Sequence, residues 1–119
     1  MKRSLLRAKI HRVTVTATEV HYEGSCAIDE ALLAAADIRE FEQVEIYDVT
    51  NGARFTTYAV KAPRDSGIVA VMGAAARLVM VGDLLIVAAY AQLDDSELEE
   101  HRPRIVHVDA QNRITDATL

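Results

Sequence analysis

Residues 43–60, QVEIYDVTNGARFTTYAV, carry the clearest fold signal in this sequence. Apolar and polar side chains alternate on both sides of Asn51-Gly52, as they do in strands with one buried face. Because asparagine and glycine both tolerate positive φ, the Asn-Gly pair predicts a β-hairpin. The second strand then has two faces, with Arg54, Thr56 and Tyr58 on one and Phe55, Thr57 and Ala59 on the other.

Further strands are predicted on both sides of this hairpin. Runs of β-branched and apolar residues with strand character are residues 9–16, 68–72, 84–91 and 104–109. In the first run, period-two alternation puts Val13 and Val15 on the same face as Lys9 and His11. The polar end of the chain, from Ala110 onward, is expected to be frayed.

Two short helices complete the predicted elements. Asp29 precedes a run of strong helix formers, residues 30–36, and its carboxylate can accept the free N–H groups of the first turn. Residues 94–100 are typical of a short acidic helix. Six or seven short strands with so little helix predict a mainly β fold. A closed or nearly closed barrel is favoured over a sandwich because it protects the sheet edges.

Size and charge exclude several classes of protein. A chain of 119 residues, half of them hydrophobic, predicts one domain, 1–119, and the net charge of -5 disfavours a nucleic-acid partner. The longest apolar run, residues 84–91, is far shorter than the about 20 residues of a membrane-spanning helix. Arg7 and Lys9 interrupt the apolar stretch near the N-terminus, which argues against a secretory signal. We therefore expect a cytoplasmic protein without a membrane partner.

The Gly24-Ser25 pair is the most unusual local segment, and its residues allow two interpretations. Gly-Ser pairs are common in loops, so this one can be a turn that leads into the helix. Alternatively, Gly24 gives the backbone a conformation closed to other residues, and the Ser25 hydroxyl then reaches the carbonyl of residue 24. In that case the serine attacks its own chain.

Four polar residues also have a structural and a chemical interpretation. Lys9 and His11 lie two apart on a strand, as a solvated edge or as a cation and a titratable donor in one cavity. Arg54 is a surface cation or a planar fork that holds a carboxylate. Tyr58 is a barrel-wall aromatic or a proton donor.

Other candidate features favour structural roles. Cys26 is the single cysteine, which excludes an intramolecular disulfide and a Cys-rich metal site and favours a small buried apolar group. The remaining histidines lack ligand spacing, so no metal is expected; they are His21, His101 and His107. The segment 73–76, GAAA, lacks the second glycine and lysine of a phosphate loop, although its small side chains would let a ligand approach the backbone.

Taken in order, these segments resemble the pyruvoyl-dependent aspartate 1-decarboxylase (L-aspartate α-decarboxylase) family. The resemblance extends from the start of the chain to about Asp109, and the combination of segments with this spacing is specific. The matching segments are 9–12 (KIHR), 21–25 (HYEGS), 50–54 (TNGAR), 57–59 (TYA), 73–76 (GAAA) and 81–83 (VGD).

The resemblance implies a small double-psi β-barrel that forms a homotetramer with active sites between subunits. It also implies an inactive proenzyme that cuts itself between Gly24 and Ser25, giving a β chain, 1–24, and an α chain, 25–119. Ser25 would become a pyruvoyl group that forms a Schiff base with L-aspartate and accepts the electrons released with carbon dioxide. The product would be β-alanine, a precursor of pantothenate and coenzyme A, with neither metal nor pyridoxal phosphate.

Roles for individual residues follow from the same resemblance. Tyr58 matches the proton donor, and Thr57 matches the hydroxyl that polarises the scissile carbonyl and also contacts substrate. His11 and Tyr22 match residues that line the cleavage site. The remaining substrate-binding positions are Lys9, Arg54, Gly73, Ala74 and Ala75, of which the two cations would receive carboxylates.

Two positions depart from the family pattern. Met72 stands where the family usually has asparagine, so a polar contact worth on the order of 1 kcal/mol is missing. Tyr47 replaces the tryptophan of some members. The alternative is therefore a barrel of the same family that stays unprocessed or catalytically impaired and acts in small-molecule binding or assembly. A separate maturation protein, which some bacteria use, is a further expected partner.

Overall fold

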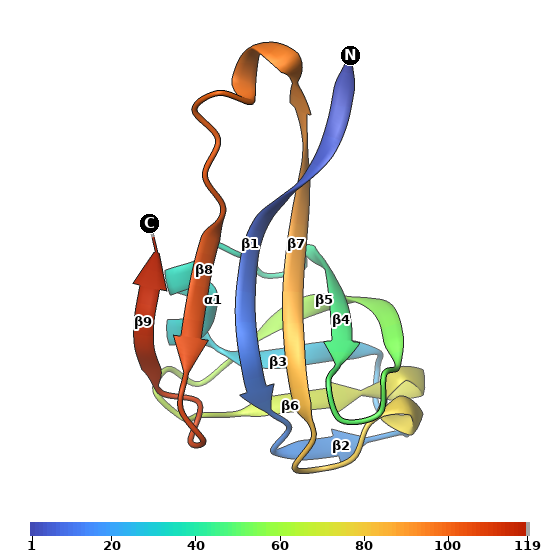
Figure 1. Ribbon diagram of the computed structural model, residues 1–119. Coiled ribbons are helices and arrows are strands. Elements are labelled where there is room, and N and C mark those ends of the chain that lie inside the picture. Colours follow the sequence, from blue (N-terminus) through green and yellow to red (C-terminus); the bar gives the residue numbers. More distant parts are fainter. Residues whose placement is uncertain (119) are drawn as a thin grey trace.

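Nine strands form one hydrogen-bonded sheet in the computed structural model, which describes residues 1–118 (Figure 1). The strands are β1 (Lys2–Thr14), β2 (Ala17–Glu19), β3 (Ser25–Asp29), β4 (Gln43–Asp48), β5 (Arg54–Ala62), β6 (Val69–Met72), β7 (Leu84–Asp94), β8 (Arg104–Val108) and β9 (Ile114–Thr118). The helices are α1 (Glu30–Ala36) and two 3₁₀ segments, η1 (Gly73–Leu78) and η2 (Asp95–Glu97). The order across the sheet is β2-β6-β3-β5-β4-β7-β1-β8-β9. The predicted mainly β class is confirmed.

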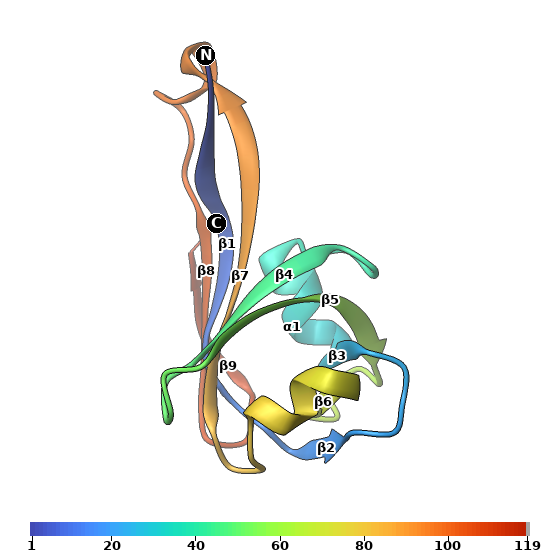
Figure 2. The ribbon, with the colours of Figure 1, turned by 90° about the vertical axis from the view of Figure 1, so that its right-hand side faces the viewer.

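The sheet curls because β1, the seventh strand in the order, continues directly into β2, the first strand in the order. At this junction the Val15 N–H donates to the Asp83 carbonyl at 2.9 Å, and the Thr16 N–H donates to the Val69 carbonyl at 2.8 Å. Figure 2 shows the resulting curved wall, in which β4 and β5 arch over β3, β6 and β2. The sheet is mixed. It contains parallel pairs, such as β3 with β5, and antiparallel pairs, such as β3 with β6 and β4 with β5.

The 43–60 hairpin is confirmed. β4 and β5 pair antiparallel from Gln43 opposite Tyr58 to Tyr47 opposite Arg54. The strands are joined by residues 49–53, in which Gly52 has φ +81° while Asn51 does not have positive φ, so the connection is longer than a two-residue Asn-Gly turn. Arg54 and Tyr58 therefore leave β5 on the same face.

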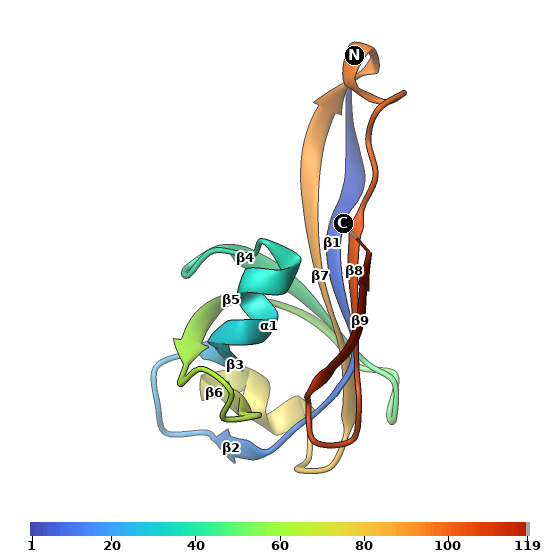
Figure 3. The same ribbon diagram turned by 90° about the vertical axis from the view of Figure 1, so that its left-hand side faces the viewer.

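Helix α1 is also confirmed, with its predicted cap. The Asp29 carboxylate accepts from the Ala31 N–H at 2.8 Å, and Leu32, Leu33 and Ala36 are buried. The helix ends at Asp37, whose φ of 55° is left-handed. It packs against strands of both halves of the sheet, including β3 and β8 (Figure 3).

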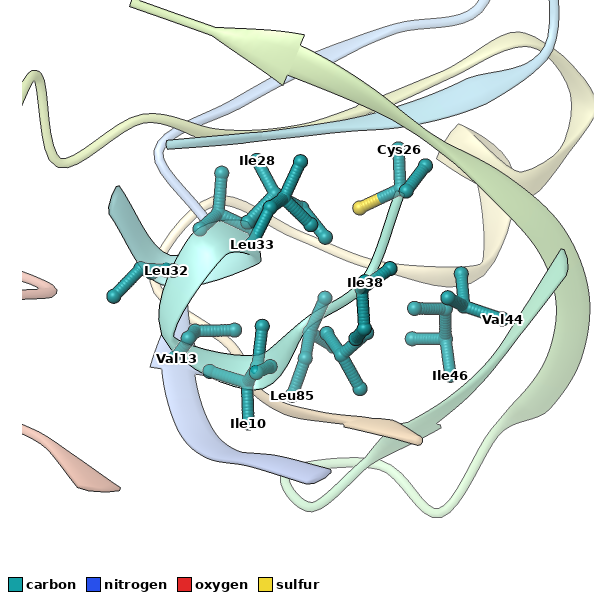
Figure 4. Packing of buried hydrophobic residues seen from close by; sticks show 14 of the residues in the cluster. Ile10, Val13, Cys26, Ile28, Leu32, Leu33, Ile38, Val44, Ile46 and Leu85 are labelled. Atoms are coloured by element: carbon teal, nitrogen blue, oxygen red, sulfur yellow. The ribbon is translucent and has the colours of Figure 1, made fainter. Parts of the chain in front are cut away.

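The core fills the barrel between α1 and the curved sheet. Figure 4 shows aliphatic side chains from β1, β3, β4, β7 and α1 pointing toward one another. Cys26 is completely buried among them, and burial raises the pKa of its thiol to about 12. It is therefore the small apolar core residue that the sequence predicted.

One predicted face is wrong in β1. Arg12 has φ 67°, and the pairing of β1 with β7 shifts between Ile10 and Val13. This irregularity inserts one extra residue, as in a β-bulge, and turns Val13 into the core with Ile10. Val13 and Val15 are therefore buried, while Lys9 and His11 are only half-buried on the other side of the strand.

The C-terminal segment is ordered as a strand, against the predicted frayed end. β9 pairs with β8, and Asn112 is buried between them and the body of the barrel. Its side chain donates to the carbonyls of Thr14 and Gly67, both at 2.9 Å, and accepts from the Thr14 N–H at 2.8 Å. The predicted acidic helix is shorter than expected, being the single turn η2.

A two-stranded ribbon projects from the barrel. It consists of residues 2–6 of β1 and residues 90–94 of β7, which pair with each other beyond the reach of β4 and β8 (Figure 1). Ion pairs of 3.1 Å between Lys2 and Asp94 and of 2.8 Å between Arg3 and Asp95 close its tip. None of the helices within residues 1–118 has the length and apolarity needed to cross a membrane.

Candidate active site

The Gly24–Ser25 bond lies where the chain enters β3. Ser25 is the first residue of the strand and only 4% exposed. Since Cys26 points into the core, strand alternation turns Ser25 to the outer face of the sheet (Figure 4). The serine is thus buried outside the hydrophobic core, at the edge of a loop.

Strand register surrounds Ser25 with specific neighbours. Met72 of β6 lies directly opposite Ser25, so the two side chains share a face. On the other side, the parallel pairing of Cys26 with Ala59 puts Tyr58 level with Ser25 and Thr57 level with Gly24. Tyr58 shares the outer face with Ser25, whereas Thr57 lies opposite the buried Val44 and faces inward.

The same row extends to two residues that sequence reasoning missed. Glu19 of β2 pairs with Met72, and Gln43 of β4 pairs with Tyr58. A row of five strands therefore crosses the outer face through Ser25. No local pattern reveals this row, because it depends on which distant strands pair and in what register.

Gly73 packs directly against Gly24, the residue that precedes the candidate cleavage bond. It has φ +79°, and a Cβ at this position would lie 2.5 Å from the Gly24 Cα, 2.9 Å from the Gly24 N and 3.2 Å from the Tyr22 carbonyl oxygen. No other residue type fits such contacts. The small segment at 73–76 therefore starts η1 with its backbone in contact with the loop that precedes Ser25.

A shallow groove runs beside Tyr58. Its volume is about 610 Å³, and it is lined by Phe41, Gln43, Thr56, Thr57 and Tyr58. The Tyr58 side chain is 38% exposed, so its phenol is accessible from solvent. This groove and the row through Ser25 meet at Tyr58.

Arg54 lies four residues before Tyr58 on the same face, and its guanidinium stacks 4.4 Å from the centre of the Tyr47 ring. The Tyr47 hydroxyl is in turn 2.8 Å from the Tyr90 hydroxyl. This hydrogen bond, followed by burial, raises the pKa of Tyr47 to about 12. Tyr47 therefore stays neutral and holds the cation by its ring face.

Lys9 and His11 lie on β1, which pairs with β7 and β8 and with none of the strands beside Ser25. Three strands, β5, β4 and β7, lie between β3 and β1 in the sheet order. His11 instead faces His107 across 5.5 Å, and its Nδ1 is buried without a hydrogen-bond partner among the described residues. Burial, with smaller effects from Lys9, His107 and Arg12, lowers the pKa of His11.

The other predicted site residues lie around the Ser25 loop. Tyr22 is 61% exposed, while its carbonyl contacts the Gly73 position. Ala74 is exposed and Ala75 half-buried in η1. The structure thus gathers Tyr22, Gly24, Ser25, Thr57, Tyr58 and the 73–75 segment, keeps Arg54 further along β5, and separates Lys9 and His11.

Among residues 1–118, no group of three or more histidine, cysteine or acidic side chains is arranged to hold a metal ion. The Ser25 hydroxyl follows the Gly24 carbonyl along the chain, and the side-chain-free Gly73 packs against the Cα and N of Gly24. A keto group formed at position 25 would fit there, with Met72 and Tyr58 beside it.

Comparison with known proteins identifies the family of this chain. Residues 1–115 match the family model described as aspartate decarboxylase. The aspartate 1-decarboxylase of Methylobacillus flagellatus is 60% identical over 96% of this chain and 90% of that protein. The one from Chromobacterium violaceum is 58% identical over 98% of this chain and 92% of that protein.

Among solved structures, the rationally designed protein mkDPBB_sym_86 aligns with 65% of this chain and 90% of its own. The TM-score is 0.48 and the identity 22%, which is too distant a likeness to bear on the fold or the site. The family match covers nearly the whole sequence, and the two relatives share more than half of their residues with it. The chain belongs to the aspartate decarboxylase family.

Proposed function

We propose that this protein is a self-processing, pyruvoyl-dependent decarboxylase that converts L-aspartate to β-alanine and carbon dioxide. Membership of the aspartate decarboxylase family supports the reaction. The observation that carries the proposal is the contact of Gly73 with Gly24 beside the buried Ser25. Backbone of the 73–76 segment therefore contacts the residue before the candidate scissile bond, and Tyr58 is level with the residue after it.

All atoms that react in the self-cleavage come from this chain and from water. The Ser25 oxygen bonds to the Gly24 carbonyl carbon, the C–N bond breaks, and the hydroxyl proton passes to the nitrogen. Loss of the Ser25 α-proton then expels residue 24 as a carboxylate and leaves a dehydroalanine. Addition of water to its imine form releases ammonia and leaves a keto group. The products are residues 1–24 and 25–119, as the resemblance implies.

Thr57 is assigned to self-cleavage and substrate binding, and Tyr58 is assigned to proton delivery after decarboxylation. Thr57 is level with Gly24 on the neighbouring strand, so we assign its hydroxyl to the scissile carbonyl and to the substrate. When formed, the pyruvoyl group supplies a carbonyl that binds the substrate amine and withdraws electrons during decarboxylation. Tyr58, level with Ser25, then delivers the proton that replaces carbon dioxide.

Substrate binding is assigned to cations and small residues. Aspartate carries two carboxylates, and Arg54, on the outer face with Tyr58, is suited to one of them by its planar fork. Gly73, Ala74 and Ala75 have small side chains and are assigned to contact the substrate through their backbone N–H groups. Lys9 is assigned to the second carboxylate.

The position of Lys9 supports a site between subunits. Lys9 and His11 lie on β1, and three other strands lie between β1 and the strand of Ser25 in the sheet order. In this assignment a second copy of the chain therefore brings Lys9 and His11 to the site. We therefore propose a homotetramer with sites shared between neighbours, where His11 and Tyr22 line the cleavage region. A cytoplasmic location is proposed because the free thiol of Cys26 suits a reducing compartment. A maturation protein remains part of the proposal.

Mass spectrometry of the purified protein tests the processing step. We expect two fragments produced by cleavage between Gly24 and Ser25, a carbonyl-reactive α chain, and release of β-alanine from aspartate. The Ser25→Ala variant should stay full-length and inactive while it retains its fold, since the attacking oxygen is gone. Cleavage of Ser25→Ala at this bond would contradict the assignment of the nucleophile.

Met72 favours a second candidate, a processed or unprocessed barrel that has lost decarboxylation. Its thioether stands directly opposite Ser25 and cannot donate a hydrogen bond. This candidate predicts no β-alanine even where a keto group is detected. A Met72→Asn variant with the same activity as its parent would remove the reason for it.

A further inference from the structure

Two buried aspartates are diagonal neighbours on the same face where β4 ends and β7 begins. Asp48 is the last residue of β4 and 2% exposed, and Asp83 precedes β7 and is 8% exposed. Asp48 pairs in register with Leu85, and the Val49 N–H donates to the Leu84 carbonyl at 2.8 Å. The turn after β4 and the turn before β7 are therefore in direct contact.

Each carboxylate organises its own turn. One oxygen of Asp48, Oδ1, accepts from the N–H groups of Thr50 at 2.8 Å and Asn51 at 3.2 Å. Asp83 Oδ2 accepts from the Met80 N–H at 3.0 Å. The second oxygen of Asp48, Oδ2, is buried and receives no donor from the described residues. A buried oxygen without a donor is costly, and more so when it is charged.

The surroundings do not neutralise this pair. Burial and a hydrogen bond with Asp83 raise the pKa of Asp48, against the smaller opposing effect of the Asn51 and Thr50 N–H groups. No cationic side chain of residues 1–118 is among the groups that shift it. The charged groups on adjoining elements are otherwise engaged or exposed: Arg54 stacks on Tyr47, Glu45 accepts from the Thr56 hydroxyl, and Arg12 and Arg77 are exposed.

We propose that Asp48 and Asp83 share one proton in the folded protein and form a carboxylic acid pair that joins the two turns. The proton gives the Asp48 carboxyl a partner in Asp83, which two carboxylates in contact cannot provide for each other. Loss of the proton leaves two buried negative charges in contact and pushes the turns apart. The pair is thus a pH-sensitive connection, independent of the cleavage proposed above.

The turn after β4, which the Asp48–Asp83 pair holds, connects β5 with η1 at the candidate site. The Asn51 side chain donates to the Leu78 carbonyl of η1 at 2.8 Å and accepts from the Ala53 N–H at 2.8 Å. Arg54 follows directly in β5. Opening of the acid pair therefore loosens the start of β5 and the end of η1 together.

The sign of the pH effect follows from the raised pKa. A carboxyl group that holds its proton more tightly in the folded than in the unfolded chain stabilises the fold below its folded pKa and loses this contribution as pH rises through it. For one proton, the folding equilibrium constant falls by up to about tenfold per pH unit in that window. The window begins above the ordinary value of 3.8.

Infrared spectroscopy and urea unfolding of the full chain test the proposal. At a pH above the ordinary aspartate range, wild type should show the C=O band of a protonated carboxyl group, and Asp48→Asn should lack it. Asp48→Asn keeps the Oδ1 acceptor and supplies its own donor to Asp83. Its stability should therefore rise relative to wild type as pH increases upward from that range. Asp83→Asn should remove the band in the same way. It provides the test if Asp48→Asn does not fold.

Asp109→Asn is the matched control. Asp109 Oδ1 also accepts two backbone N–H groups, from Gln111 at 2.9 Å and Arg113 at 3.0 Å, but Asp109 is exposed and has no acidic partner. This variant should keep the band and the pH dependence of wild type. Absence of the band from wild type, or its persistence in both pair variants, would overturn the proposal. So would a pH dependence of stability that is the same in wild type and the folded pair variants.

Discussion

Glycine is required at position 73 for two separate reasons. Its φ of +79° is left-handed, and its Cα faces the Gly24 backbone so closely that an added methyl group would overlap it. Both opposing atoms belong to the backbone, so they cannot rotate away as a flexible side chain would. The residue therefore couples the start of η1 to the chain just before Ser25.

We predict that Gly73→Ala costs about 3 kcal/mol of stability, from backbone strain and overlap together. Gly52→Ala separates these effects, since Gly52 has φ +81° with nothing within 4 Å of an added Cβ. That control should lose only about 1 kcal/mol. Urea unfolding of both variants in the Ser25→Ala background measures stability without cleavage. Equal losses in the two variants would show that the Gly24 contact has no energetic role.

Among the elements, the β8–β9 hairpin depends on one buried side chain. Asn112 has φ 61° and bonds three backbone groups of the β1 end and the Gly67 loop. β9 itself is mostly exposed, so its own packing contributes little. The order of the C-terminal segment therefore rests on long-range hydrogen bonds.

Replacement of Asn112 by glycine should lower the free energy of unfolding by about 3 kcal/mol, because three buried backbone groups lose their partner. Glycine tolerates the positive φ, so backbone strain does not contribute. Asn112→Asp keeps the acceptor for the Thr14 N–H but turns a carboxylate oxygen toward the Thr14 and Gly67 carbonyls, so it should lose at least as much. Urea unfolding and amide exchange in β9 measure both effects. An exchange rate in β9 that Asn112→Gly leaves unchanged would contradict this account.

These elements show what local sequence determines. Asn51-Gly52 and Asp29 act on residues within a few positions, and the hairpin and α1 followed from them. The bulge at Arg12 and the hydrogen bonds of Asn112 depend on partners far along the chain. The predicted face of Val13 and the predicted frayed end were therefore wrong. In the candidate site, the Gly24-Ser25 segment and the small residues at 73–75 were identified from sequence. Their contact, and the row through Glu19 and Gln43, required the strand register.

On the scale of the whole molecule, the mainly β barrel agrees with the fold that the family resemblance implies. β1 lies inside the sheet, between β7 and β8, and supplies the buried residues Ala8, Ile10 and Val13. Cleavage after Gly24 would therefore separate a central strand from the rest of the chain. The two fragments would remain one folded body held only by non-covalent contacts.

Isolated residues 25–119 should then fail to fold, because the sheet lacks a strand between β7 and β8 and the core lacks its side chains. Addition of a peptide of residues 1–24 should restore the strand spectrum in far-UV circular dichroism, with a yield that depends on concentration. Intact Ser25→Ala refolded under the same conditions is the comparison. A native-like spectrum from residues 25–119 alone would contradict the prediction.

The ribbon has a practical consequence for protein engineering. It carries the N-terminus at its tip, outside the curved wall of the barrel, whereas Thr118 lies beside β8 opposite Ile105 (Figure 1). An affinity tag or fluorescent fusion at the amino end would be displayed away from Ser25 and from the groove beside Tyr58. Attached at the carboxyl end, the same cargo would crowd the β8–β9 edge. Amino-terminal fusions are therefore the better design for immobilising this protein.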